Sequence, residues 1–309
     1  MTIPADSPAA ARWRRLVTGR LEELSRLSPA AGSVSGSFWD GRAERYAKNV
    51  RATDGAKDPF LRRLRRLTDA STSVVDVGAG TGRHALALAP GVRHVTAVDP
   101  SAAMLAVLRR GAEQLAITNL TTLQAPWDTA DVTTADVACS SFVLTLVPDG
   151  AAFLAKLDAV ARRRVLLYLG AYCVDAVLDP LWRHFHDVPR VPGPSYIDAL
   201  AVLGELGIEP VVRVVEVADD RRFATIQEAA EHYREWMFLD DTPAVMRELE
   251  RLLAAWLMGR RGALRSPLRS MPAAIIEWEP RTGVGVGGDG NPAPVSVLRP
   301  SSMDRRGQI

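Results

Sequence analysis

Residues 73–170 alternate short apolar runs with stretches of helical spacing. The apolar runs are typical of strands, and they cover 73–77, 92–98, 121–124, 136–144 and 164–169. Helical spacing between them covers 83–88, 101–110 and 150–161. The run 136–144 is almost continuously apolar, as expected for a strand buried on both faces of a parallel sheet. This alternation predicts an α/β fold, a doubly wound, mostly parallel sheet with helices on both faces.

Helical patterns flank this region on both sides. Before it, helices are predicted over 8–27, 37–50 and 59–67, the last with Asp58 as its cap and Pro59 in its first turn. After residue 170 the predicted helices are 174–187, 196–206, 226–238 and 243–258, and the predicted strands are 210–217 and 273–278. From residue 282 the chain is rich in Gly, Pro and Ser, which predicts disorder. We therefore divide the chain into N-terminal helices over 1–70, a main domain over 71–280 with helical insertions at about 171–194 and 219–270, and a tail over 281–309.

Composition and charge indicate where the protein is expected to be located and which partners are not expected, but they say little about its activity. The 309 residues are 47% hydrophobic and carry a net charge of +2, so bulk charge gives no reason to expect nucleic acid or an anionic membrane as a partner. Cys139 and Cys173 lie in apolar runs without the spacing of metal ligands. Residues 1–27 lack the apolar core of a signal peptide, and no apolar stretch reaches the length of a membrane span. We expect a cytoplasmic protein without a metal site.

The candidate chemistry is concentrated in a glycine loop after the first predicted strand. Gly78, Gly80 and Gly82 alternate directly after the acid Asp76 and Val77. A plain tight turn is one interpretation, because glycine adopts positive φ at little cost. Three alternating glycines at the first strand-to-helix turn of an α/β sheet instead favour the close approach of a ligand to the backbone.

A dinucleotide site is the second alternative for this loop. Its glycine pattern is G-x-G-x-x-G, but here the third glycine comes one residue early and Arg83 stands where that pattern has glycine. Asp76 would also repel a pyrophosphate. The same carboxylate suits a ligand with an ammonium group, and S-adenosylmethionine carries both an ammonium and a sulfonium charge.

Segment 76–82, with Ala79 between its first two glycines, resembles motif I of the class I S-adenosylmethionine-dependent methyltransferases. The resemblance covers roughly residues 72–170. The next family landmark is an acid at the end of the second strand, matched here by Asp99, which is followed by Pro100. A carboxylate at this place can accept hydrogen bonds from both ribose hydroxyls of an adenosine. The resemblance implies seven strands with the last antiparallel, and a lid built from the N-terminal helices and the insertions.

Three further residues are assigned to the cofactor site through this resemblance. Trp127, in the loop after the third strand, is placed where the family lines the adenine pocket, and stacking on adenine and packing in the core are equally good interpretations. Ser140 lies near the end of the fourth strand, which faces the methyl donor in this family. Tyr46 belongs to a segment, with Phe38 and Trp39, that resembles the helix covering the cofactor, and it is expected to cap the methionine end.

Candidate bases are few. His184 and His186 fall in the first insertion, and on a helix their rings point to different faces, which argues against a shared metal. Packing or surface histidines are the neutral interpretation, and these two are our catalytic candidates.

These features predict S-adenosylmethionine-dependent transfer of a methyl group to O, N or C of a small molecule. No Asn/Asp-Pro-Pro-Tyr/Phe or Pro-Cys sequence follows the fourth strand, so methylation of nucleic-acid bases is not favoured. Two alternatives stay open, a methyltransferase acting on RNA or protein and a binding or regulatory protein that keeps the fold without catalysis. A nicotinamide oxidoreductase fits least, because its pyrophosphate would lie beside Asp76.

Overall fold

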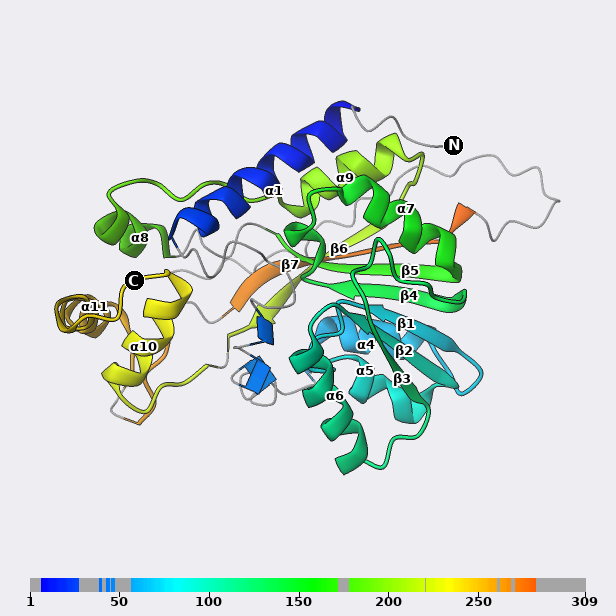
Figure 1. The fold of residues 1–309 in the computed structure, drawn as a ribbon, viewed down its shortest axis with the longest axis horizontal. Coiled ribbons are helices and arrows are strands. Elements are labelled where there is room, and N and C mark those ends of the chain that lie inside the picture. The colour runs from blue at the N-terminus through cyan, green and yellow to red at the C-terminus, as the bar shows by residue number, and fades with distance from the viewer. Residues whose placement is uncertain are drawn as a thin grey trace, which may run out of the picture.

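A computed structural model places seven strands in one sheet, in the order β3-β2-β1-β4-β5-β7-β6 (Figure 1). The strands are β1 Ser73–Val77, β2 His94–Asp99, β3 Leu120–Gln124, β4 Ala135–Ser141, β5 Ala161–Gly170, β6 Val211–Ala218 and β7 Ser270–Trp278. Strands β1 to β5 pair in parallel, and β7 runs antiparallel to both β5 and β6. This confirms the seven-stranded, mostly parallel sheet with an antiparallel last strand.

The structure describes residues 7–27, 39–40, 43–44, 46–47, 57–171, 178–219, 221–259, 262–267 and 270–281. Several predictions lie outside these residues: most of the helix over 37–50 with Phe38, the start of the helix over 174–187, Cys173, and the disordered tail from 282. Within the described part of the chain, no helix is both long enough and apolar enough to span a bilayer.

Helices cover both faces of the sheet (Figure 1). The helices α4 Pro59–Leu67, α5 Ala85–Leu88 and α6 Ala102–Gln114 lie on one face, and α1 Pro8–Leu27, α7 Gly150–Val160 and α9 Tyr196–Glu205 lie on the other. Alternate residues of β1 supply the two cores, because successive side chains of a strand point to opposite faces. Val75 is buried in the core under α7 and α9, and Val74 in the core under α4.

The first helix packs against α7 and α9 on the outside of the sheet. Trp13 of α1 is fully buried, and its indole N–H donates to the carbonyl of Val147 over 2.9 Å. A Cβ on Gly150 would lie 2.5 Å from that indole nitrogen, so the start of α7 has to be glycine for α1 to pack. Glu205, at the end of α9, accepts hydrogen bonds from the first backbone amides of α1. Residues 8–27 therefore complete the outer layer of one face.

Three further helices form a separate helical unit, α8 Asp179–His186, α10 Ile226–Trp236 and α11 Pro243–Trp256. Their own core includes the fully buried Trp182, with Phe223, Tyr233 and Leu249. The unit lies on the side of the sheet where β5 ends and β7 begins (Figure 1). These helices occupy the two stretches predicted as insertions.

Strand β4 ends three residues earlier than its apolar run predicted. Phe142 has φ 57°, the left-handed region, and its N–H donates to the carbonyl of Tyr168 over 2.8 Å. A short 3-10 helix, η4 Leu144–Leu146, follows at once. Phe142 and Val143 are apolar because they pack on β5 and on the glycine loop, not because they extend the strand.

Candidate functional site

The glycine loop begins at the carboxyl end of β1, and its three glycines all have positive φ. A Cβ on Gly78 would lie 2.1 Å from the Val143 side chain, and one on Gly82 would lie 2.9 Å from Leu86 and Leu108. These two glycines therefore allow close packing within the fold. Gly80 is different, because a Cβ there would meet nothing within 4 Å. Gly80 thus marks the open side of the loop.

The loop is fixed against the neighbouring strand β2 by hydrogen bonds. The backbone N–H groups of Gly78 and Ala79 both donate to the carbonyl of Val98. Asp99 accepts from the N–H of Gly80 through Oδ2 and from that of Ser101 through Oδ1, both over 2.9 Å. Burial raises the pKa of Asp99, and the two amide hydrogen bonds partly offset this. The following residue, Pro100, is exposed at the same edge.

Asp76 is buried just before the loop, and its two oxygens differ in their hydrogen bonds. Oδ1 accepts from the thiol of Cys139 over 3.7 Å. Oδ2 is buried and has no hydrogen-bond partner among the described residues. Burial raises the pKa of the Asp76 carboxyl, and the charge of His84, the Cys139 thiol and the backbone N–H of Ala85 partly offset this. A buried polar atom without a partner is rare in folded proteins, and a donor group from a bound molecule would satisfy it.

Tyr46 lies close enough to this loop for the charges of Arg83 and Asp99 to act on it. Its ring is partly exposed and meets the edge of Trp39, with ring centroids 5.8 Å apart. Burial of its hydroxyl raises the pKa of Tyr46, while the charge of Arg83 lowers it and that of Asp99 raises it. Asp40 fixes this segment to the start of α6 by accepting from the Ser101 hydroxyl over 2.6 Å. The structure therefore brings Tyr46 together with the glycine loop and Asp99.

Trp127 and Ser140 have partners within the fold. Trp127 is buried, its N–H donates to the carbonyl of Phe153 over 3.2 Å, and the Lys156 ammonium lies 4.7 Å from its ring centroid. These contacts favour the packing interpretation of Trp127. Ser140 is buried at the end of β4, and its hydroxyl donates to the carbonyl of Val77 over 2.9 Å. That bond ties β4 to the residue that precedes the glycine loop.

The candidate histidines lie in the helical unit instead. His184 Nε2 is 2.9 Å from Glu248 Oε1, and His186 Nε2 is 2.9 Å from the carbonyl oxygen of Met237. The ring of His186 also packs on Trp182, with centroids 4.2 Å apart. Their described contacts are all within this unit, so the structure does not bring them to the loop. Their catalytic role stays a prediction.

Sequence reasoning missed a buried cluster behind the loop. Asp58 Oδ2 is 2.9 Å from Arg83 Nη2 and 3.1 Å from His84 Nε2. Burial alone would raise the pKa of Asp58, but the hydrogen bond from His84 and the charges of His84 and Arg83 hold it well below its usual range. The Phe60 ring stacks on Tyr168 with centroids 4.9 Å apart. The pattern predicts Asp58 as a helix cap, but it contains no signal for Arg83 and His84, which lie 25 and 26 positions later and share this carboxylate.

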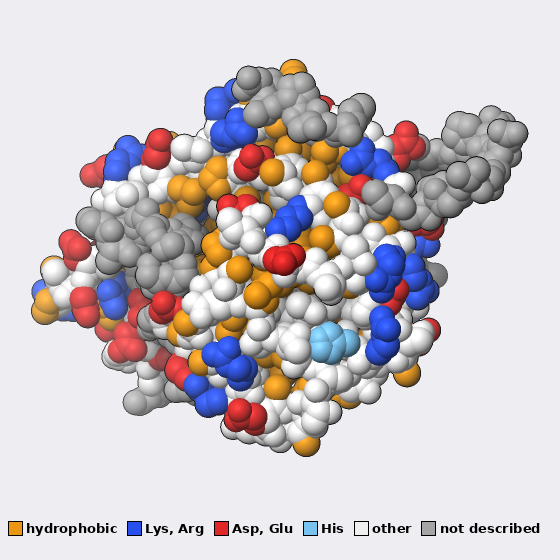
Figure 2. All heavy atoms as spheres, turned by 45° about the vertical axis from the view of Figure 1, so that its right-hand side comes forward, with side chains coloured by type: hydrophobic (Ala, Val, Ile, Leu, Met, Phe, Trp, Pro, Cys, Tyr) orange, Lys and Arg blue, Asp and Glu red, His pale blue; other side chains and the backbone are white. Residues whose placement is uncertain are grey.

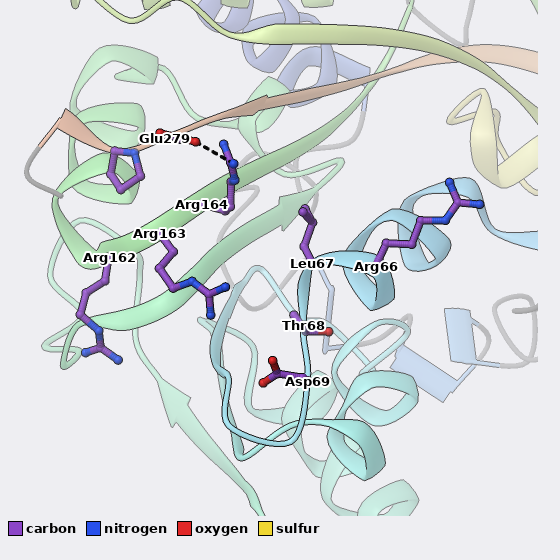
Figure 3. A pocket seen from close by; sticks show the side chains of 9 residues that line it. Arg66, Leu67, Thr68, Asp69, Arg162, Arg163, Arg164 and Glu279 are labelled. Atoms are coloured by element: carbon purple, nitrogen blue, oxygen red, sulfur yellow. Dashed lines mark ion pairs between the residues drawn. The ribbon is translucent and has the colours of Figure 1, made fainter. Parts of the chain in front are cut away.

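A cavity of about 490 Å³ lies at the opposite edge of the sheet, where β5 begins and β7 ends (Figure 3). Arg66, Arg162, Arg163 and Arg164 line it, and Arg164 pairs with Glu279 over 2.7 Å. In Figure 3 the three arginines of β5 point in different directions rather than toward one centre. Several Lys and Arg side chains also gather near the right-hand rim of the face drawn in Figure 2. This cavity is separate from the glycine loop.

Comparison with known proteins agrees with the geometry. A family model described as a methyltransferase domain matches residues 74–164, from β1 into β5. An uncharacterized protein of Haemophilus influenzae is 30% identical over 184 residues, which are 58% of this chain and 66% of that protein. The match thus spans just under two thirds of that relative's length.

Two solved structures resemble the fold. The YcgJ protein of Bacillus subtilis is 16% identical, with a TM-score of 0.51 over 72% of this chain and 97% of that chain. A candidate methyltransferase of Bacillus halodurans C-125 is 18% identical, with a TM-score of 0.51 over 71% and 97%. At these identities both show the fold alone. Residues 74–164 thus match a methyltransferase domain, and with its strand order and glycine loop the chain is similar to the class I S-adenosylmethionine-dependent methyltransferases.

Proposed function

We propose that this chain transfers the methyl group of S-adenosylmethionine to O, N or C of a small molecule. The observation that carries the proposal is the buried Asp76 carboxylate, whose Oδ2 makes no hydrogen bond of normal geometry among the described residues, just before a loop with open space at Gly80. A dinucleotide would bring phosphates to this carboxylate, whereas the ammonium group of S-adenosylmethionine supplies N–H donors and a positive charge.

The residues around the loop fit the other parts of that cofactor. Asp99 ends β2 beside Gly80, where its carboxylate would accept hydrogen bonds from ribose hydroxyls in addition to the Gly80 amide. Tyr46 would cover the methionine end. The bound cofactor supplies a methyl group on a positively charged sulfur. The protein has to align that methyl with the acceptor atom and exclude water.

The position of the helical unit supports a small-molecule acceptor. The helical unit of α8, α10 and α11 lies beside the end of β5, and we propose that it and the segment around Tyr46 form the lid over the substrate. A closed lid suits a small acceptor better than a polymer. His184 and His186 belong to this unit and are its proposed proton acceptors, which requires that the unit move toward the loop. The cytoplasmic location stays a prediction.

Calorimetric titration with S-adenosylmethionine and, separately, with NADH tests the cofactor. We expect binding of S-adenosylmethionine alone and its loss in Asp99→Ala. Asp131→Ala, which removes an exposed acid elsewhere, is the matched control and should bind like the unaltered chain. Well-folded protein that binds no S-adenosylmethionine would overturn the proposal and favour the non-catalytic alternative.

An RNA substrate is the second candidate, and one observation favours it. Two adjoining cavities are lined by arginines of α4, β5 and β6, which are Arg62, Arg63, Arg66, Arg162, Arg163, Arg164 and Arg213. Arg66 and Arg163 make no ion pair within 4.0 Å among the described residues, and the charge of Arg163 acts on Asp69 from farther away. The two ends of the seven-residue β4 lie roughly 20 Å apart, so a polymer rather than a small molecule would reach both this surface and the loop.

Fluorescence anisotropy with a short labelled RNA separates the two candidates. An RNA-binding surface predicts binding that weakens steeply with salt and is lost in Arg66→Glu/Arg163→Glu. Arg247→Glu, which changes an exposed arginine on α11, should leave it unchanged. If the unaltered chain does not bind RNA, or if it and both variants bind RNA equally well, an RNA substrate is excluded.

A further inference from the structure

The two residues directly after the glycine loop share one partner from a distant helix. Arg83 and His84 both bind Oδ2 of Asp58, at 2.9 Å from Arg83 Nη2 and 3.1 Å from His84 Nε2. The Arg83 Nε lies 3.1 Å from the same oxygen. Asp58 therefore makes contact with the first two positions after Gly82.

Asp58 is held in place independently of these contacts. Its other oxygen accepts from the backbone N–H of Phe60 and Leu61 and so caps α4. Helix α4 is fixed to the sheet by the fully buried Phe60, Leu61 and Leu64. The Phe60 ring also touches the edge of His84, with centroids 5.0 Å apart. A buried carboxylate so anchored is a rigid counter-ion for Arg83.

The charge of Arg83 matters for the cofactor site. The side chain is 23% exposed, and its charge acts on the hydroxyl of Tyr46, as does that of Asp99. Arg83 is thus a fixed positive charge beside a site that receives two more, an ammonium and a sulfonium. An uncompensated guanidinium at this place would repel the cofactor, because like charges interact strongly where water is excluded. Asp58 neutralises it.

We propose that Asp58 is a positioning residue that compensates the charge of Arg83 and thereby lets the site accept the positively charged sulfonium of its cofactor. This inference rests on the proposed function. It distinguishes two ligands of nearly the same shape, because S-adenosylhomocysteine lacks the methyl group and the sulfonium charge. A purely structural role would affect both ligands equally, whereas charge compensation affects S-adenosylmethionine more.

Calorimetric titration of both ligands tests this in Asp58→Asn. The asparagine keeps an oxygen to cap α4 and removes the charge, and thermal melting checks that the variant folds. We expect the affinity for S-adenosylmethionine to fall roughly three- to tenfold more than that for S-adenosylhomocysteine, from one unpaired charge at the site edge. Adding Arg83→Met should restore the original ratio of affinities. Arg109→Met, which alters an exposed arginine on α6, is the matched control.

Arg83→Met alone gives a second measurement if Asp58→Asn does not fold. It removes the guanidinium from Asp58, which keeps His84 and the α4 amides as partners, so the ratio should shift in favour of S-adenosylmethionine. The inference is overturned if Asp58→Asn weakens the affinity for both ligands equally. It is also overturned if Arg83→Met leaves the ratio of the two affinities unchanged. If the unaltered chain binds neither ligand, the proposed function itself has failed.

Discussion

At the scale of single residues, the loop glycines differ in what surrounds them. Gly78→Ala would drive a Cβ into Val143, only 2.1 Å away, and would strain a backbone with φ 73°. We expect it to destabilise the fold by about 2–4 kcal/mol. Gly80→Ala meets open space, so the backbone strain alone should cost about 1 kcal/mol while cofactor binding is lost. Urea unfolding and calorimetry on the two variants check this, and equal stability losses would contradict it.

Trp127 illustrates how a residue can fit two patterns in sequence. An aromatic after the third strand suits an adenine pocket, but the structure shows its N–H bound to Phe153 and its ring beside Lys156. Trp127→Phe should lower the free energy of unfolding by roughly 1–2 kcal/mol, through loss of one hydrogen bond and a weaker cation–π contact. The Kd for S-adenosylmethionine should stay within about twofold. A large loss of affinity at unchanged stability would instead support stacking on adenine.

At the scale of elements, the start of β4 is joined to both neighbouring strands by one acid. Asp136 Oδ2 accepts from the N–H and hydroxyl of Ser73 on β1, and Oδ1 accepts from Arg162 on β5. Burial alone would raise the pKa of Asp136, but these hydrogen bonds and the charge of Arg162 lower it to about 2.

Asp136 therefore makes stability depend on acidity in a defined window. Its pKa is lower in the folded than in the unfolded chain, so its contribution is complete above about pH 5 and is lost as pH falls toward 2. Asp136→Asn should lower the free energy of unfolding by about 1–2 kcal/mol at neutral pH, with allowance for the water around Arg162. Urea unfolding between pH 3 and 7 checks this. If the free energy of unfolding changes with pH by the same amount in Asp136→Asn and in the unaltered chain, the prediction is wrong.

The bounds of an element were predictable from the sequence where its apolar residues are apolar for a single reason, burial in a core. Strand β1 and helix α4 begin and end where the pattern placed them, because their apolar residues all face a core. The end of β4 was wrong by three residues, since Phe142 and Val143 are apolar for contacts with β5 and the loop. Asp58 was recognised as a cap, but its partners Arg83 and His84 come together with it only in the folded chain.

At the scale of the whole molecule, the sheet and the helical unit have separate cores. The helical unit has one small core around Trp182. Strands β1, β4 and β5 are instead buried between two larger cores, one on each face of the sheet. Hydrogen exchange should therefore be slowest in these strands, and α8, α10 and α11 should open together at lower free energy. Mass spectrometry of exchanging peptides, with and without S-adenosylmethionine, checks this. Protection confined to residues 76–101, with none in the unit, would contradict its role as a lid.

The hydrogen bonds of Lys156 affect how readily this protein can be labelled at its amines. The ammonium of Lys156 donates to the carbonyl oxygens of Trp127, Asp128 and Ala130, which holds the loop before β4 in place. An acylating reagent would have to break three hydrogen bonds before reaching that nitrogen. The sequence contains only three lysines. At most two side-chain amines should therefore react readily, which suits this protein to attachment of a dye or a surface at few, defined positions.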